Sequence, residues 1–248
     1  MNNLFGYVPG NSVIHRLNPV TKIFLTIAVC VAAFISDNLA YLAGLLAVDL
    51  LIGFAAGVPG KTLTIFRGLL KIALFLFALQ ILMIRRGTPV FWIITDEGLL
   101  TAVRVVLRLV IVCMPLALVL AVTRISDLTN SFVQVLHVPY QYAFTLSTAI
   151  RFIPQFLEEM NGIMEAQTAR GVAFDKARGL KKFSMILPLC APLLISSVRR
   201  TDQTAAAAEL RGFRLRTRQS AYKRYPFTAL DLAAGVFSAA LIAGALLI

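Results

Sequence analysis

Apolar residues are gathered into long runs that alternate with short polar segments along the chain. Five of these runs reach the ~17 to 20 residues that a helix needs to cross the hydrocarbon core of a bilayer. They cover Val20–Ser36, Leu39–Val58, Gly68–Ile84, Val105–Val122 and Leu230–Ile248. The pattern predicts an all-α, polytopic membrane protein with about five transmembrane helices.

A sixth apolar run, Phe183–Val198, is shorter and has different flanks. It contains Pro188 and Pro192, two lysines precede it, and Arg199 and Arg200 follow it. If the run crossed the membrane, one basic cluster would lie outside the cell, against the usual bias of Lys and Arg toward the cytoplasm. We therefore predict a helix that lies against membrane or protein on the cytoplasmic side. A short true span is the alternative.

Composition excludes several classes of protein. Hydrophobic residues make up 58% of the chain and charged residues 15%, with a mean hydropathy of +0.80, which excludes an ordinary soluble domain. The three cysteines and two histidines stand apart from one another, so no zinc or iron–sulfur pattern can be assembled. The phosphate-binding pattern GxxxxGK[ST] is missing as well. We predict no catalytic group, no cofactor and no metal site.

Positive charge is concentrated in the second half of the chain. The net charge is +12, and the stretch from Arg170 to Arg224 holds thirteen Lys or Arg against three acids. Such a block is typical of the cytoplasmic side of a membrane protein; nucleic acid is not expected, because an apolar helix interrupts the basic run. His15, Arg16 and Lys22 place the N-terminus in the cytoplasm too.

These patterns divide the chain into three parts. Residues 1–124 are predicted to hold the first four transmembrane helices, 125–226 a cytoplasmic domain with two long helices, and 227–248 the last transmembrane helix.

Both long helices of the predicted cytoplasmic domain end in arginine and glycine. The first ends at Ala169–Gly171, and the second runs from about Pro188 to Leu210–Gly212. The ordinary explanation is that arginine complements the helix dipole and glycine takes the left-handed position after the helix. The alternative is a guanidinium presented at each helix tip to pair with carboxylates of a partner. A third copy, at Arg178, follows too closely for another helix and is predicted to be a basic linker.

Three stretches of the sequence carry a family resemblance: YVPGNSVIHRLNPVTK (Tyr7–Lys22), AQTARGVAF and AAELRGF. The chain resembles the T component of energy-coupling factor (ECF) transporters over nearly its whole length. The first stretch is similar to the family's Pro-Gly-x-Ser turn followed by His-x-Leu-x-Pro-x-x-Lys. The other two resemble its pair of Ala-Arg-Gly motifs, although Leu210 stands where the family often has Ala.

The resemblance implies a non-catalytic coupling subunit of an ATP-driven importer for a vitamin or other micronutrient. The implied partners are two ABC-type ATPases, identical or different, a small substrate-binding membrane (S) component and the lipid bilayer. The implied location is the plasma membrane of a bacterium or archaeon. The residues implied to couple to the ATPases are Ala169, Arg170, Gly171, Leu210, Arg211 and Gly212. Those implied to face the S component are Phe152, Phe156, Met160, Met164, Leu187 and Leu194.

Asp49 interrupts the second predicted span, where an unpaired carboxylate is costly. It is interpreted as a polar contact between helices, with Lys71 as the candidate partner; an ion or proton site is the alternative. The rival to an ECF subunit is a membrane scaffold or secondary-transporter subunit without ATPase partners. A transporter needs polar groups or broken helices near the midplane, where only Asp49, Gln80 and Pro115 qualify. A scaffold gives the paired arginine tips no role.

Overall fold

The computed structural model describes residues 7–10, 12–83, 89–91, 94–172, 174, 184–216 and 223–247. They form two compact units: unit 1 is the chain up to Leu136 together with the chain from Tyr225 onward, and unit 2 is His137–Arg224. Helices predominate in both. The strands of the described residues are those of a short antiparallel hairpin in unit 1, β1 (Pro89–Phe91) and β2 (Ile94–Thr95). The predicted all-α fold class is confirmed.

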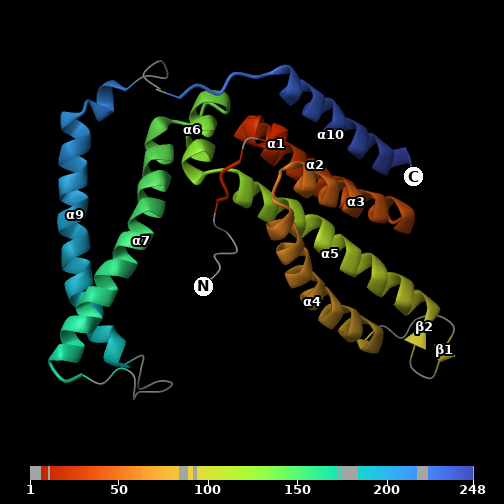
Figure 1. The fold of residues 1–248 in the computed structure, drawn as a ribbon, viewed down its shortest axis with the longest axis horizontal. Coiled ribbons are helices and arrows are strands. Elements are labelled where there is room, and N and C mark those ends of the chain that lie inside the picture. The colour runs from red at the N-terminus through yellow and green to blue at the C-terminus, as the bar shows by residue number, and fades with distance from the viewer. Residues whose placement is uncertain are drawn as a thin grey trace. The chain divides into compact units, whose positions relative to one another are not determined.

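Unit 1 is a helical bundle. Its described helices are α1 (Val13–Arg16), α2 (Pro19–Ile35), α3 (Leu39–Ala55), α4 (Pro59–Met83), α5 (Asp96–Val122), α6 (Ile125–Val135) and α10 (Ala229–Leu247). Helix α5 packs along α4 on one side and along α2 and α3 on the other, while α10 packs on α2 (Figure 1). The two helices at the centre of the bundle are therefore α2 and α5.

Asparagine residues fix the start of α2 and of α3. The Oδ1 of Asn18 accepts a hydrogen bond from the N–H of Val20 at 3.1 Å, and Pro19 opens α2 at a position where its missing N–H breaks no bond. Asn38 caps α3 in the same way through the N–H of Ala40, at 2.9 Å. Both helices consequently begin within one residue of the predicted runs.

All five predicted runs are helical over most of the residues that the structure describes in them. By length and composition, α4, α5 and α10 can cross a membrane, whereas α2 and α3 are apolar helices of 17 residues each, about 26 Å long and near the lower limit for a span. Helices α4 and α5 begin at Pro59 and Asp96 rather than at the expected Gly68 and Val105. Hydropathy marks only the apolar part of a helix, and the acidic first turn of α5 suits the positive end of its dipole.

Small side chains at the centre of unit 1 let its helices approach closely. The buried cluster that joins α2, α3, α5 and α10 consists of Val29, Ala32, Ala33, Leu42, Leu45, Ile111 and Ala245. Large apolar side chains such as Leu74 and Phe75 are instead exposed on the outside of α4. This distribution fits a multi-pass unit whose outer surface contacts lipid.

Arg108 of α5 closes the C-terminal end of α2. Its Nε donates to the carbonyl oxygen of Ala33 at 2.8 Å, and a terminal nitrogen donates to the carbonyl of Ser36 at 3.0 Å and to Asp37 at 2.9 Å. The last carbonyls of a helix have no donor within the helix, so this arginine satisfies them. Sequence reasoning did not single out Arg108, because a lone arginine in an apolar run does not reveal which helix end it meets.

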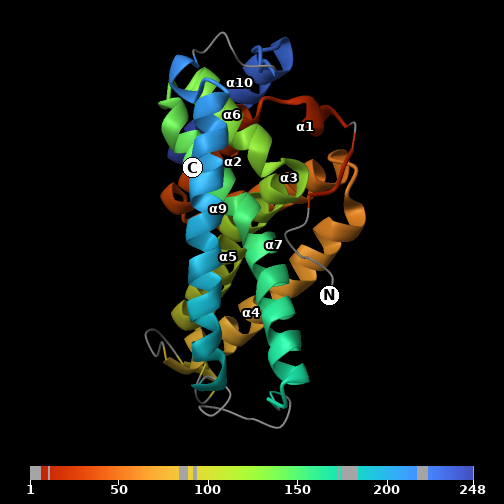
Figure 2. The same ribbon diagram turned by 90° about the vertical axis from the view of Figure 1, so that its left-hand side faces the viewer.

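Unit 2 is built on two long helices, α7 (Tyr140–Ala169) and α9 (Cys190–Leu210), which are drawn from a second side in Figure 2. The 3₁₀ turns η2 (Leu187–Leu189) and η3 (Phe213–Leu215) precede and follow α9. Arg200 of α9 pairs with Glu159 of α7 at 3.2 Å and donates to Gln155 at 3.1 Å. The two helices therefore meet near the middle of each.

The described part of the sixth apolar run, 184–198, ends in the helix that carries the second arginine tip. It forms one helical turn, then η2, then the first half of α9. Pro188 is the second residue of η2 and Pro192 the third residue of α9, positions whose N–H groups have no hydrogen-bond partner within their own element. Its placement against membrane or protein stays a prediction.

Candidate functional site

The C-terminal tip of α7 has the turn that its sequence predicts. Arg170 is the C-cap, and Gly171 follows in the left-handed region with φ 95°. The N–H of Val172 donates to the carbonyl of Gln167 at 3.1 Å, and that of Gly171 to the carbonyl of Thr168 at 2.9 Å. These two bonds form a Schellman motif, which fixes the backbone of Arg170 just beyond the helix.

The tip of α9 is closed in a similar way. Arg211 is the C-cap, Gly212 has φ 74°, and its N–H donates to the carbonyl of Glu209 at 2.9 Å. Leu210, at the position where the sequence departs from the Ala-Arg-Gly pattern, is 89% exposed. A larger residue at this position therefore meets little packing constraint in the described part of unit 2.

Both guanidinium groups face solvent. Arg170 and Arg211 are exposed, and no hydrogen bond or ion pair joins either side chain to another residue among those described. The nearby Arg214, by contrast, pairs with Glu209 at 3.3 Å. A guanidinium without an internal partner keeps its five donors for an external carboxylate. The middle copy of the motif, at Arg178, lies outside the described residues.

The two tips lie at opposite ends of the helix pair. Phe213, two residues after Arg211, packs on Tyr140 and Phe144 in the first turns of α7, with ring centroids 5.5 and 4.8 Å apart. Arg170 closes the other end of α7, which has 30 residues and is about 45 Å long at the helical rise. The two arginines are therefore separated by most of the length of α7 (Figure 1).

The residues implied to face an S component differ in exposure. Leu187 and Leu194, at the start of α9, are 60% and 64% exposed. Four others on α7 are half-buried: Phe152, Phe156, Met160 and Met164. Ile153 and Leu157, on the same helix, are more exposed than these four. Helical periodicity identified the helix, but it does not rank the faces of a helix by exposure.

The opening stretch of the chain forms a compact turn. The Nε2 of His15 lies 3.1 Å from the carbonyl oxygen of Val8, which requires a proton on Nε2, and Nδ1 then accepts from the hydroxyl of Ser12 at 2.7 Å. The Nζ of Lys22 donates to the carbonyl of His15 at 3.2 Å and to Thr123 at 3.3 Å. The histidine and lysine of the motif thus hold the start of the chain against the end of α5.

Five residues far apart in the sequence connect the segments beside the unit boundary. We call Asn18, Asp127, Gln134, Tyr225 and Asp231 the Tyr225 clasp. Tyr225 donates from its N–H to Gln134 at 3.1 Å and from its hydroxyl to Asp127 at 2.9 Å. Asn18 donates from its side chain to the carbonyl of Tyr225 at 3.1 Å and from its N–H to Asp231 at 2.9 Å. Burial, and then the hydrogen bond to Asp127, raise the pKa of Tyr225, so its hydroxyl stays a donor.

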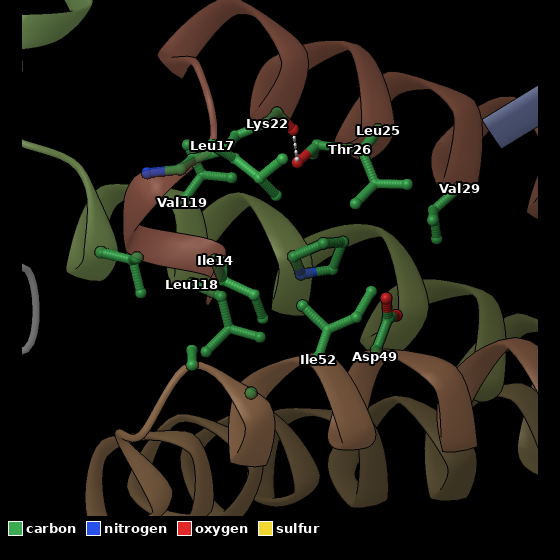
Figure 3. A pocket seen from close by; sticks show the side chains of 14 residues that line it. Ile14, Leu17, Lys22, Leu25, Thr26, Val29, Asp49, Ile52, Leu118 and Val119 are labelled. Atoms are coloured by element: carbon green, nitrogen blue, oxygen red, sulfur yellow. Dashed lines mark hydrogen bonds between the residues drawn. The ribbon is translucent and has the colours of Figure 1, made fainter. Parts of the chain in front are cut away.

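The expected contact between Asp49 and Lys71 is wrong. Asp49 is 0% exposed, and neither carboxyl oxygen has a hydrogen-bond partner among the described residues, while Lys71 is exposed on α4. Figure 3 shows the Asp49 carboxyl group pointing into a cavity of about 70 Å³ whose other lining is apolar except for Lys22 and Thr26. Because α3 is apolar on every side, its sequence does not indicate which neighbour an internal aspartate meets.

Known proteins are similar to this chain over most of its length. The family model described as a cobalt transport protein, CbiQ, matches residues 10–222. The energy-coupling factor transporter transmembrane protein EcfT of Thermosediminibacter oceani is 34% identical, over 97% of this chain and 95% of the relative. The proteins of the same name from Bacillus subtilis and Acidaminococcus fermentans are 32% and 34% identical, over 91% and 84% of this chain and 89% and 82% of their own lengths.

Proposed function

Because the chain belongs to the CbiQ family, as an EcfT-type transmembrane component of energy-coupling factor transporters, we propose that it couples two ABC-type ATPases to a small substrate-binding S component. The transported substrate is a vitamin or another micronutrient. The ATPases hydrolyse ATP, and this chain transmits their movement without a catalytic step of its own. Unit 2 and the N-terminus lie in the cytoplasm of a bacterial or archaeal cell.

The placement of Arg170 and Arg211 supports this proposal most directly. Each stands at a helix tip, exposed and without an internal partner among the described residues, and most of the length of α7 separates them. Two arginines that only complemented helix dipoles would have no need to keep their side chains free of hydrogen-bond and ion-pair partners within the described part of the chain. Their separation suits two docking points on two subunits, and the ATPases can be identical or different.

The chemistry of each tip fits a docking contact. A planar guanidinium can bind a carboxylate through two parallel hydrogen bonds, which fixes direction as well as position. The Schellman turn holds the backbone of Arg170 by its own hydrogen bonds, so less freedom is lost when the side chain binds. Movement of an attached ATPase is then passed to a rigid helix rather than to a flexible loop.

The exposed apolar residues of unit 2 suit the S component. Leu187 and Leu194 stand out from the start of α9, and exposed apolar surface of this kind marks a contact with protein or lipid. The alternative function, a scaffold or secondary-transporter subunit without ATPase partners, assigns no role to the arginine tips.

Co-purification with co-expressed ABC ATPases in detergent tests the proposal. The double charge reversal Arg170→Glu/Arg211→Glu should abolish capture of the ATPases, because it removes both pairings and places negative charge against the partner carboxylates that the proposal requires. Arg178→Glu, in the middle copy of the motif, is the control and should retain the ATPases. Thermal unfolding of each variant establishes that the membrane unit is intact.

The outcomes separate the two interpretations of the tips. Loss of the ATPases in the double variant alone supports the coupling function. Retention in all variants would reduce Arg170 and Arg211 to helix caps, and the absence of ATPases from the wild-type chain would favour the scaffold or transporter function.

A further inference from the structure

The chain passes between the two units twice, and the segments beside the two crossings are hydrogen-bonded to each other. Unit 1 stops at Leu136 and resumes at Tyr225. The bond from the N–H of Tyr225 to Gln134, 3.1 Å long, joins these two segments. His137, the first residue of unit 2, has φ 62°, a left-handed conformation that is uncommon for residues with a Cβ.

The second crossing is held by the Tyr225 clasp. From Tyr225 to the start of α10 at Ala229 the chain is not helical, and a free segment of this length could absorb a displacement of about 10 Å. The bonds from Tyr225 to Asp127, Gln134 and Asn18 remove this slack, because they attach the crossing to α6 and to the start of α2. A pull on this crossing then reaches two helices of unit 1 directly.

Asn18 extends the connection to α10. Its Oδ1 caps α2 at Val20, its side-chain nitrogen bonds to Tyr225, and its N–H bonds to Asp231 in the first turn of α10. Asp231 also accepts hydrogen bonds from the N–H and the hydroxyl of Thr228, at 2.8 and 2.7 Å. One residue of the opening stretch therefore links the crossing to the first turns of α2 and α10, which pack against each other.

We propose that the Tyr225 clasp is the mechanical link through which movement of unit 2 reaches the membrane helices, and that its members are positioning residues for coupling. The inference rests on the proposed function, because it assigns the movement to nucleotide binding by the partner ATPases. This proposal also gives the opening stretch Tyr7–Lys22 a role in coupling, because the stretch supplies Asn18 and holds it at the start of α2.

Amide hydrogen exchange of the assembled complex, measured with and without ATP plus vanadate, shows which segments respond when nucleotide is trapped, and so tests this link directly. Three bonds of the clasp region start at backbone N–H groups, those of Asn18, Tyr225 and Thr228. In the wild type, nucleotide trapping should change exchange by about threefold or more at the two tips, in peptides 165–172 and 207–216, and also in peptides 12–22 and 223–231.

Weakening the clasp should separate these responses. In the double variant Tyr225→Phe/Asn18→Asp, which removes the amide donor to the Tyr225 carbonyl but keeps the oxygen that caps α2, the tips should still respond to the nucleotide, but the response of peptide 12–22 should be lost. The single variant Tyr225→Phe retains the ring and the bonds of the Tyr225 backbone, so it should give an intermediate response. If the double variant does not fold, the comparison of Tyr225→Phe with the wild type provides the test.

Tyr41→Phe is the matched control, because it removes another phenol hydrogen bond of unit 1, from Tyr41 to the carbonyl of Leu241. It should leave the response of peptide 12–22 unchanged. The inference is overturned if peptide 12–22 does not respond in the wild type, if its response survives in both Tyr225 variants, or if Tyr41→Phe removes it too. Tips that do not respond in the wild-type complex would contradict the proposed function itself, and the role of the clasp with it.

Discussion

The rings of Phe144 and Phe213 lie 4.8 Å apart, and this contact holds the end of α9 against the first turns of α7. Arg216 adds to the contact: its guanidinium lies 4.0 Å from the ring centroid of Tyr140 and donates to the Tyr140 hydroxyl at 2.7 Å. The tip that carries Arg211 is thus braced by aromatic side chains, whereas a backbone turn closes the tip that carries Arg170.

Phe213→Ala should loosen the tip of α9 and leave the tip of α7 unchanged. The half-buried ring contributes packing area and aromatic contacts, so its removal should lower the free energy of local opening by about 1–3 kcal/mol. Faster hydrogen exchange in peptide 207–216, with unchanged exchange in 165–172, would show this. Leu215→Ala removes a side chain that is exposed in the structure, and it should alter neither peptide. Equal effects of the two substitutions would contradict the bracing role of Phe213.

Glycine should be required at position 171 for its backbone conformation alone. A Cβ at Gly171 would meet no heavy atom within 4 Å, but φ is 95°, a region in which a side chain costs about 1–2 kcal/mol. Gly171→Ala should therefore fray the tip and weaken capture of the ATPase docked there by about five- to thirtyfold. Titration of the ATPase against the variant measures the loss.

Gly162→Ala is the matched control for Gly171→Ala. Gly162 lies inside α7, and its Cβ would likewise meet nothing within 4 Å. There alanine should stabilise the helix by about 0.5–1 kcal/mol, so the same substitution should act with opposite sign at the two positions. Equal effects would show that the left-handed turn at Gly171 does not hold the tip.

The helix tips could be predicted from the sequence because the signals are local. Arg170-Gly171 and Arg211-Gly212 end their helices through bonds to residues within one turn, and the apolar runs locate the membrane helices for the same reason. The starts of α4 and α5 were missed, because hydropathy does not mark the polar end of a helix. The fold class and the candidate tips therefore follow from short-range pattern.

The contacts that join distant segments could not be predicted. Asn18 and Asp231 are 213 residues apart, and Gln134 and Tyr225 are 91 apart, so no periodicity or spacing connects them. Arg108 looks like any charged residue in an apolar run until the end of α2 is placed beside it. Long-range packing decides these partners, and only the fold shows it.

Replacing each tip arginine with lysine should separate charge from geometry. Arg170→Lys and Arg211→Lys keep the positive charge but lose the planar fork that binds a carboxylate through two bonds. Each should weaken ATPase capture by about 1–2 kcal/mol, less than the corresponding change to glutamate. Salt titration of the complexes provides the measurement. If lysine binds as tightly as arginine, the docking contact depends on charge alone.

Asp49→Leu should stabilise the chain. The buried carboxyl group of Asp49 has no partner among the described residues, and its desolvation is costly whether it is charged or neutral. Leucine adds apolar volume beside a cavity of about 70 Å³, so the free energy of unfolding should rise by about 1–3 kcal/mol. The control Asp49→Asn should change the free energy of unfolding by less than about 1 kcal/mol, because the amide group is equally unsatisfied. Thermal unfolding in detergent compares the two variants.

A cavity of this size can hold water. A loss of stability in Asp49→Leu would therefore mean that the carboxyl group binds an ordered water or a cation there. The ion-site interpretation of Asp49 would then replace the purely structural one.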